Sequence, residues 1–408
     1  MRKLVRKVAL GAAALAAVAL LAAVYLAVAP ATAVPSAAAA TAAPSATPSP
    51  STSPSGSPSP SSSPSATPTP PPALKLVSLA PRAKATNVSF AARIRIRFSA
   101  AIAPGTPLPK LKPAVPGVWK IIDGTTLVFV ARGHLPIYTR LYVTVPGGGG
   151  GVLAIDGARL AKGFTVSFTV GGPSSLPRLR QLLAELNYLP VRFVVPAGGK
   201  YASALGRESH QLDLIPLKPL SGRFLWRYRH IPSGLAAVWR SGVSTVMLRG
   251  AIMEFESDHK MAADGVAGRA VWTAVLKDAS KHLMTRRPYR YLEVSRAIPQ
   301  TLRVWSNGRI IYSTACNTGI ASRPTAAGTF PVYARYLSTT MSGTNPDGSH
   351  YSDPGVPWVA YFNGGDAVHG FRRGSYGWPQ SLGCVELPYS SAAVVYRYDP
   401  IGTLVAVF

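Results

Sequence analysis

Acidic residues and cysteine are scarce in this 408-residue chain. It has 16 Asp and Glu against 43 Lys and Arg, a formal net charge of +27, so its electrostatic field attracts polyanions. Only two cysteines occur, Cys316 and Cys384, which excludes a disulfide framework. The two could pair with each other, or one could be a buried thiol and the other a reactive one.

The N-terminal segment, residues 1–33, predicts export. Its first seven residues carry four cationic side chains, and an uncharged apolar run extends from Val8 to Ala29. This run is about long enough to span a ~30 Å hydrocarbon core with its basic end in the cytoplasm. Alternatively, it is a signal peptide cleaved near Ala31-Thr32-Ala33. Either way we expect an extracytoplasmic protein, anchored in the membrane or secreted to the cell wall. Its expected partners are then the membrane and anionic wall polymers, and not nucleic acid.

Residues 34–73 differ from the rest of the chain in composition. They are almost only Ser, Pro, Ala, Thr and Gly, without a charged residue. Such a segment has too little apolar surface to fold and favours extended conformations. We therefore expect a disordered linker between the N-terminal membrane helix and the folded domains.

Residues 74–172 show the alternation of β-strands, seen best at Arg93–Phe98, where arginine and apolar residues take turns. Short strand-like runs separated by Pro and Gly favour a β-sandwich of about one hundred residues. The stretch Ser78–Pro81, followed by this alternating run, resembles the opening of bacterial Ig-like modules. We expect the arginines to lie on a solvated face.

Residues 173–284 change to helical periodicity, with apolar residues at i, i+3, i+4 and i+7. The stretch Asp264–Trp272 resembles the DGxxGxxxW signature of a small helical domain similar to peptidoglycan-binding domains. The resemblance implies that the Asp-Gly turn caps a helix and that Trp272 packs under the next one. Residues 190–233 fit this domain poorly and are expected to be an insertion. The periodic apolar residues are Leu179, Leu182, Leu183 and Leu186.

Residues 285–408 return to strand-like runs and carry two short motifs. Ala367-Val368-His369-Gly370 is followed by Ser381-Leu382-Gly383-Cys384-Val385-Glu386. With Pro324–Phe330 upstream, this order resembles the L,D-transpeptidase family, with its YkuD-type catalytic domain. The expected fold is therefore multidomain and mostly β: a β-sandwich, a small helical bundle and a mainly-β catalytic domain.

The residue types of the two motifs fit nucleophilic catalysis. A thiol attacks a carbonyl as the thiolate, and a neighbouring imidazole can accept its proton and later protonate the leaving amine. His369 and Cys384 are too far apart for contact within one element but can meet across two. Gly383 permits close backbone approach, so its amide and that of Cys384 can face an oxyanion. The resemblance implies that the carbonyl of Gly370 orients His369.

Two positions depart from the family pattern. Leu382 stands where the family usually has a second histidine, and Glu386 stands where Arg or Asn is common. These departures put recognition of the donor peptide in question. Candidate substrate-binding residues are Ser381, Tyr361 and Trp378.

The resemblance implies that Cys384 attacks the amide between the third residue and D-Ala of a peptidoglycan tetrapeptide stem. The acyl-enzyme then reacts with an amine of a neighbouring stem, which gives a 3→3 cross-link, or with water, as in an L,D-carboxypeptidase. The resemblance implies that this reaction needs neither a cofactor nor a metal, and a zinc site is not expected because Cys316, His369 and Cys384 lack zinc-ligand spacing. The alternative is a wall-associated peptidoglycan-binding protein with an inactive transpeptidase-like domain. A papain-like peptidase is excluded by the order of histidine and cysteine.

Overall fold

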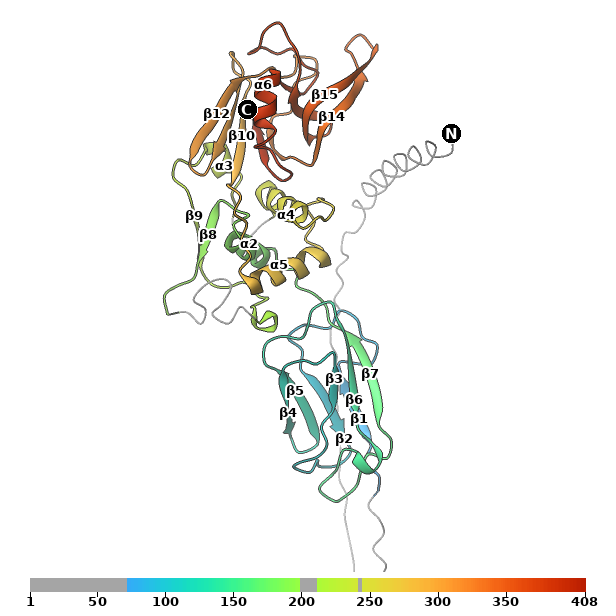
Figure 1. The fold of residues 1–408 in the computed structure, drawn as a ribbon. Helices are drawn as coiled ribbons and strands as arrows, with labels where there is room; N and C mark the ends of the chain where they lie inside the picture. Colours follow the sequence, from blue (N-terminus) through green and yellow to red (C-terminus); the bar gives the residue numbers. More distant parts are fainter. Residues whose placement is uncertain (1–71, 199–210, 241–243) are drawn as a thin grey trace, which may run out of the picture. The chain divides into compact units, whose positions relative to one another are not determined.

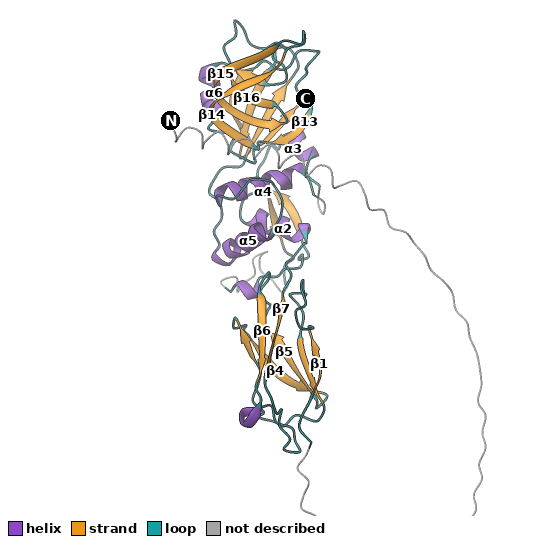
Figure 2. Ribbon diagram, turned by 90° about the vertical axis from the view of Figure 1, so that its right-hand side faces the viewer, coloured by secondary structure: helices purple, strands orange, loops and turns teal. Residues whose placement is uncertain are grey.

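The computed structural model describes residues 72–198, 211–240 and 244–408. In these parts the chain is mostly β, with few helices (Figure 2). The predicted membrane segment and nearly all of the predicted linker lie outside the described residues. Within the described ranges, no helix is both long and apolar enough to cross a membrane.

Seven strands between residues 76 and 169 form two antiparallel sheets around one apolar core (Figure 1). The predicted alternation at residues 93–98 appears as β2, in which Ile94, Ile96 and Phe98 are buried and the intervening arginines are exposed. Burial of each such side chain contributes about 1.5–3 kcal/mol. The first sheet has the order β1 (Leu76–Ala80), β2 (Ile94–Phe98), β5 (Thr126–Ala131), β4 (Gly117–Ile122), and the second β3 (Lys110–Lys112), β6 (Arg140–Val145), β7 (Phe164–Thr169).

Three helices of ten or more residues follow, with leucines of the first buried at the predicted spacing. They are α2 (Leu176–Glu185), α4 (Val246–Asp258) and α5 (Arg269–Lys281). Trp272 on α5 is buried in their shared core, as expected. Asp264, however, caps no helix: its carboxylate accepts the Val266 N–H, and Gly268 is the residue before α5. A hairpin of β8 (Val191–Val194) and β9 (Arg223–Trp226), the short α3 (Ser233–Ala237) and a 3₁₀ turn at Leu212–Leu214 complete this part of the chain. A further 3₁₀ turn, Gly148–Gly150, lies between β6 and β7 of the sandwich.

The last 120 residues contain two sheets that share an apolar core. The first has the order β12-β11-β10-β18-β13, and the second β14-β15-β16-β17. Strand β16 (Asp366–Gly370) pairs with β17 (Val385–Leu387) in parallel, which brings His369 opposite Glu386 and beside the loop that ends at Cys384. The other elements are β10 (Arg290–Ser295), β11 (Thr301–Ser306), β12 (Arg309–Ala315), β13 (Gly328–Pro331), β14 (Ala334–Thr344), β15 (His350–Asn363), α6 (Tyr389–Val395) and β18 (Leu404–Val407).

Candidate active site

A cavity of about 770 Å³ lies against the second of these sheets. Its walls come from β14, β15 and β16 and from the loop before β17. Both sequence motifs contribute to it, because the parallel pairing of β16 and β17 sets their ends side by side. Among the lining residues are Tyr361, His369, Arg373, Ser381, Cys384 and Glu386.

His369 is held in one tautomer. Its side chain is buried, and Nδ1 lies 3.1 Å from the carbonyl oxygen of Gly370. Because a carbonyl only accepts, Nδ1 carries the proton and Nε2 keeps a lone pair. Burial lowers the pKa of His369, so the imidazole is neutral near pH 7. This arrangement suits a general base, and it gives Gly370 the orienting position that the resemblance implied.

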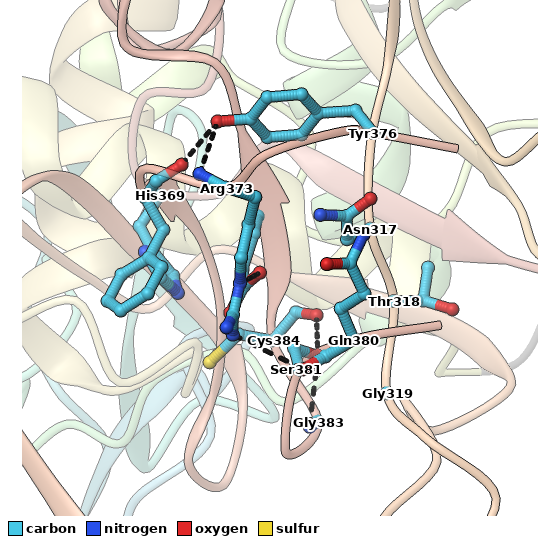
Figure 3. Close-up of polar contacts among 12 residues, drawn as sticks. Asn317, Thr318, Gly319, His369, Arg373, Tyr376, Gln380, Ser381, Gly383 and Cys384 are labelled. Carbon is cyan, nitrogen blue, oxygen red and sulfur yellow. Dashed lines mark hydrogen bonds and ion pairs between the residues drawn. The ribbon is translucent and has the colours of Figure 1, made fainter. Parts of the chain in front are cut away.

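The loop that carries Cys384 is shaped by Ser381 and Gly383 (Figure 3). The Ser381 hydroxyl donates to the carbonyl of Cys384 at 2.6 Å and accepts the Gly383 N–H at 3.2 Å. Gly383 has φ +125°, and a Cβ there would lie 2.5 Å from a carboxylate oxygen of Asp366. Both the backbone conformation and the close approach require glycine at this position.

Cys384 and His369 line the same cavity, but no hydrogen bond joins them among the described residues. The thiol lies 3.7 Å from the Gly365 carbonyl, to which it donates, and the Ala367 N–H donates to the sulfur. Burial raises the pKa of Cys384 above its ordinary value. Together with the lowered pKa of His369, this favours a neutral thiol and a neutral imidazole in the resting site. Catalytic hydrogen bonds of this kind often form only once substrate is bound.

The expected oxyanion donors are only partly available. The Gly383 N–H is already bonded to Ser381, whereas the Cys384 N–H makes no hydrogen bond within the described residues. A serine hydroxyl placed two residues earlier was the competing acceptor that the motif alone did not reveal. In this structure Cys384 therefore offers the open amide at the nucleophile.

The three candidate substrate-binding residues are placed differently. Tyr361 on β15 and Ser381 both line the cavity. Ser381 is buried and its hydroxyl is committed to the loop, so it positions Cys384 instead of facing substrate. Trp378 lies outside the cavity lining, and 49% of its surface is exposed.

Several residues that shape the site were missed from the sequence. Asn317 is fully buried, and its side-chain oxygen accepts the N–H groups of Gly377 and Trp378. Thr325 accepts the Gly319 N–H at 2.8 Å and lies 3.5 Å from the carbonyl of Cys384. Asn317 and Thr325 lie in the segment between β12 and β13, and no local pattern marked them, because their partners lie up to about sixty residues away.

Glu386 is paired with a residue that the motifs did not single out. It receives two hydrogen bonds from the guanidinium of Arg373, Nε to Oε2 at 2.8 Å and Nη2 to Oε1 at 2.7 Å. The acidic residue that departs from the family pattern at position 386 is thus neutralised by an ion pair with Arg373.

Cys316 lies directly after β12 in the apolar core and is fully buried. Burial raises its pKa to about 12. Both cysteines are free thiols in the structure. The prediction of one buried thiol and one at the site agrees with this placement.

Two family matches agree with the architecture. Residues 289–407 match the L,D-transpeptidase catalytic domain, YkuD, and residues 69–170 match a bacterial Ig-like domain. No curated protein matches the chain.

The similar solved structures are L,D-transpeptidases. One from Mycobacterium smegmatis is 12% identical, covering 82% of this chain and 99% of that chain at a TM-score of 0.27. L,D-transpeptidase 3 from Mycobacterium tuberculosis, in complex with a faropenem-derived adduct, is 13% identical in sequence. The match covers 81% of this chain and 97% of that chain at a TM-score of 0.27. The catalytic domain of the E. faecium L,D-transpeptidase acylated by ertapenem is 27% identical in sequence. That match covers 30% of this chain and 100% of that chain, also at a TM-score of 0.27. Because these TM-scores are low, the assignment of residues 289–407 to the L,D-transpeptidase catalytic domain depends on the family match and on the geometry of the site.

Proposed function

Because residues 289–407 are an L,D-transpeptidase catalytic domain, we propose that the protein forms 3→3 peptidoglycan cross-links through an acyl-enzyme on Cys384. The observation that carries this proposal is the fixed tautomer of His369, which leaves a lone pair on Nε2 of a residue that lines the same cavity as Cys384. The chemistry follows from these two groups and from the open amide of Cys384.

In the first step, His369 Nε2 takes the thiol proton as Cys384 Sγ attacks the carbonyl between the third stem residue and D-Ala. Deprotonation during attack suits a site in which burial keeps both groups neutral at rest. The Cys384 N–H donates to the oxyanion. Collapse breaks the amide bond, and the proton on His369 passes to the departing D-Ala amine, which leaves a thioester.

In the second step, an amine on the third residue of a neighbouring stem attacks the thioester. His369 accepts a proton from this amine and returns one to the thiolate, so the enzyme is regenerated and an amide cross-link remains. Water in place of the amine gives L,D-carboxypeptidase activity. Every group that this reaction needs is a side chain or amide of the chain itself.

The proposed place of action rests on the N-terminal sequence. We propose an extracytoplasmic protein whose residues 1–33 direct export or anchor the chain in the membrane. The net charge of +27 favours contact with anionic wall polymers, and the helical region at 173–284 is a proposed peptidoglycan contact. Fractionation of cells that express a C-terminally tagged chain tests this, and recovery in the cytosol would contradict it.

The test of function is incubation of the full chain with purified disaccharide-tetrapeptides, followed by mass analysis of the muropeptides. We expect D-alanine release and 3→3 linked dimers. Binding of the stems without turnover would instead favour the non-catalytic wall-binding protein.

A carbapenem provides an independent probe of the nucleophile. The E. faecium catalytic domain named above was solved acylated by ertapenem. We expect ertapenem to acylate this chain at Cys384 and not at Cys316, because only the former reaches the cavity. Peptide mapping of the treated protein checks the position, and an adduct on Cys316 would contradict the assignment.

A further inference from the structure

Arg373 combines a fixed position with an open donor edge. Its Nε and Nη2 hold Glu386, and Nη2 also lies 3.2 Å from the carbonyl of Gln380. The guanidinium carbon lies 4.7 Å from the ring centre of Phe371. These contacts set the plane of the guanidinium before any ligand arrives. Its backbone N–H donates to Tyr376, which anchors the start of the side chain (Figure 3).

The partner of Arg373 is itself rigid. Glu386 lies on β17, is buried, and exchanges two backbone hydrogen bonds of 2.9 Å with Asn317. It follows Cys384 by two residues, and both residues line the cavity. The pair therefore holds the cation at the wall of the cavity that also contains the nucleophile.

The remaining edge of Arg373 is open. The N–H groups of Nη1 make no hydrogen bond within the described residues, and 31% of the side chain is exposed. Among the residues that line the cavity, Arg373 is the sole Lys or Arg, whereas Asp353, Asp366 and Glu386 are acidic. Arg373 is therefore the one cation in this lining that a substrate carboxylate can meet.

We infer that Arg373, held by Glu386, is a specificity-determining residue that binds the free carboxylate of the D-Ala to be released. This inference rests on the proposed function. A tetrapeptide stem ends in that carboxylate, one residue beyond the attacked carbonyl. In a longer stem the same carboxyl group is an amide and carries no charge. Arg373 thus selects donors that end at the fourth residue.

The experiment compares two synthetic donors that differ only in charge, a tetrapeptide stem with a free C-terminal carboxylate and its C-terminal amide. Release of D-alanine or D-alaninamide by the full chain gives kcat/KM for each. For wild type we expect a preference for the carboxylate of about ten- to a hundredfold, the size expected for charge-assisted hydrogen bonds.

Arg373→Gln should abolish this preference by lowering kcat/KM for the carboxylate donor while leaving the amide donor nearly unchanged. Arg373→Lys should keep part of the preference, since it retains charge without the planar fork. The matched control is Arg372→Gln, which removes an exposed neighbouring cation outside the cavity lining and should change neither donor.

Loss of Arg373 alone leaves the buried Glu386 without its partner, which can unfold the loop. The double variant Arg373→Gln/Glu386→Gln removes the cation without this defect and should show the same lost preference. Its thermal unfolding midpoint, compared with wild type, verifies the fold.

Three results would overturn the inference. They are equal wild-type rates on the two donors, equal losses on both donors in the folded double variant, and an unchanged preference in that variant. In each of these the proposed function stands, because D-Ala is still released by wild type. If wild type acted on neither donor, the proposed function would fail and the inference with it.

Discussion

The two cysteines occupy opposite kinds of environment. Cys316 is sealed in the apolar core after a regular strand, whereas Cys384 ends an irregular loop at a cavity that also contains His369. Burial raises the pKa of both thiols, so a resting thiolate does not distinguish them. The two thiols differ in their access to the cavity and in the presence of His369 as a base, because only Cys384 shares a cavity with it. In this fold, reactivity therefore depends on what the loop presents to the cavity.

Removal of each thiol in turn gives the largest expected contrast. Cys384→Ala should lower D-alanine release at least about a thousandfold, because it deletes the nucleophile. Cys316→Ala should keep most activity, since it leaves a small apolar side chain in the core. Release of D-alanine from tetrapeptide stems is the measurement, and substantial turnover by Cys384→Ala would refute the nucleophile assignment.

The shape of the loop is the next target. Gly383→Ala places a Cβ 2.5 Å from Asp366 in a backbone conformation that side chains rarely adopt. Displacement of a nucleophile by about 1 Å can cost about a hundredfold in rate, so we expect a loss of that order in kcat. Gly374→Ala is the matched control, because a Cβ there meets nothing within 4 Å. Similar rates for the two variants would mean that the loop does not position Cys384.

The contrast between the two cysteine regions also explains what the sequence could predict. Strand alternation gave β2 with its buried Ile94 and Ile96, because one buried face leaves a period of two. The order of His369 and Cys384 indicated a shared site. By contrast, the pair of Arg373 with Glu386 and the bonds of Asn317 join residues that are 13 and about sixty positions apart in the sequence. No local pattern encodes such partners, because the fold brings them together.

The backbone amides of Gly383 and Cys384 show that sequence prediction is limited for neighbouring residues too. The motif suggested that both Gly383 and Cys384 donate to an oxyanion, but Ser381 takes the Gly383 N–H. Trp378 was expected near substrate from its aromatic character alone, and it lies outside the cavity lining. Side-chain direction in an irregular loop depends on hydrogen bonds that composition does not reveal.

The smallest expected effect is on pH dependence. Burial lowers the pKa of His369, and the base acts in its neutral form. Activity is therefore lost as the pH falls through this lowered pKa, so the acidic limb of kcat/KM should lie below the ordinary histidine value of about 6.5. A pH profile on the tetrapeptide donor measures it. An acidic limb above 6.5 would show that His369 is not the buried neutral base described above.

The most direct test of the central claim is to trap the acyl-enzyme. The full chain is mixed with a tetrapeptide donor in the absence of an acceptor stem, quenched in acid within the first turnover, digested and mapped by mass spectrometry. We predict a thioester to the shortened stem on the peptide that contains Cys384, and an unmodified Cys316. D-Alanine release without acylation of Cys384, or with the acyl group on another residue, would contradict the account.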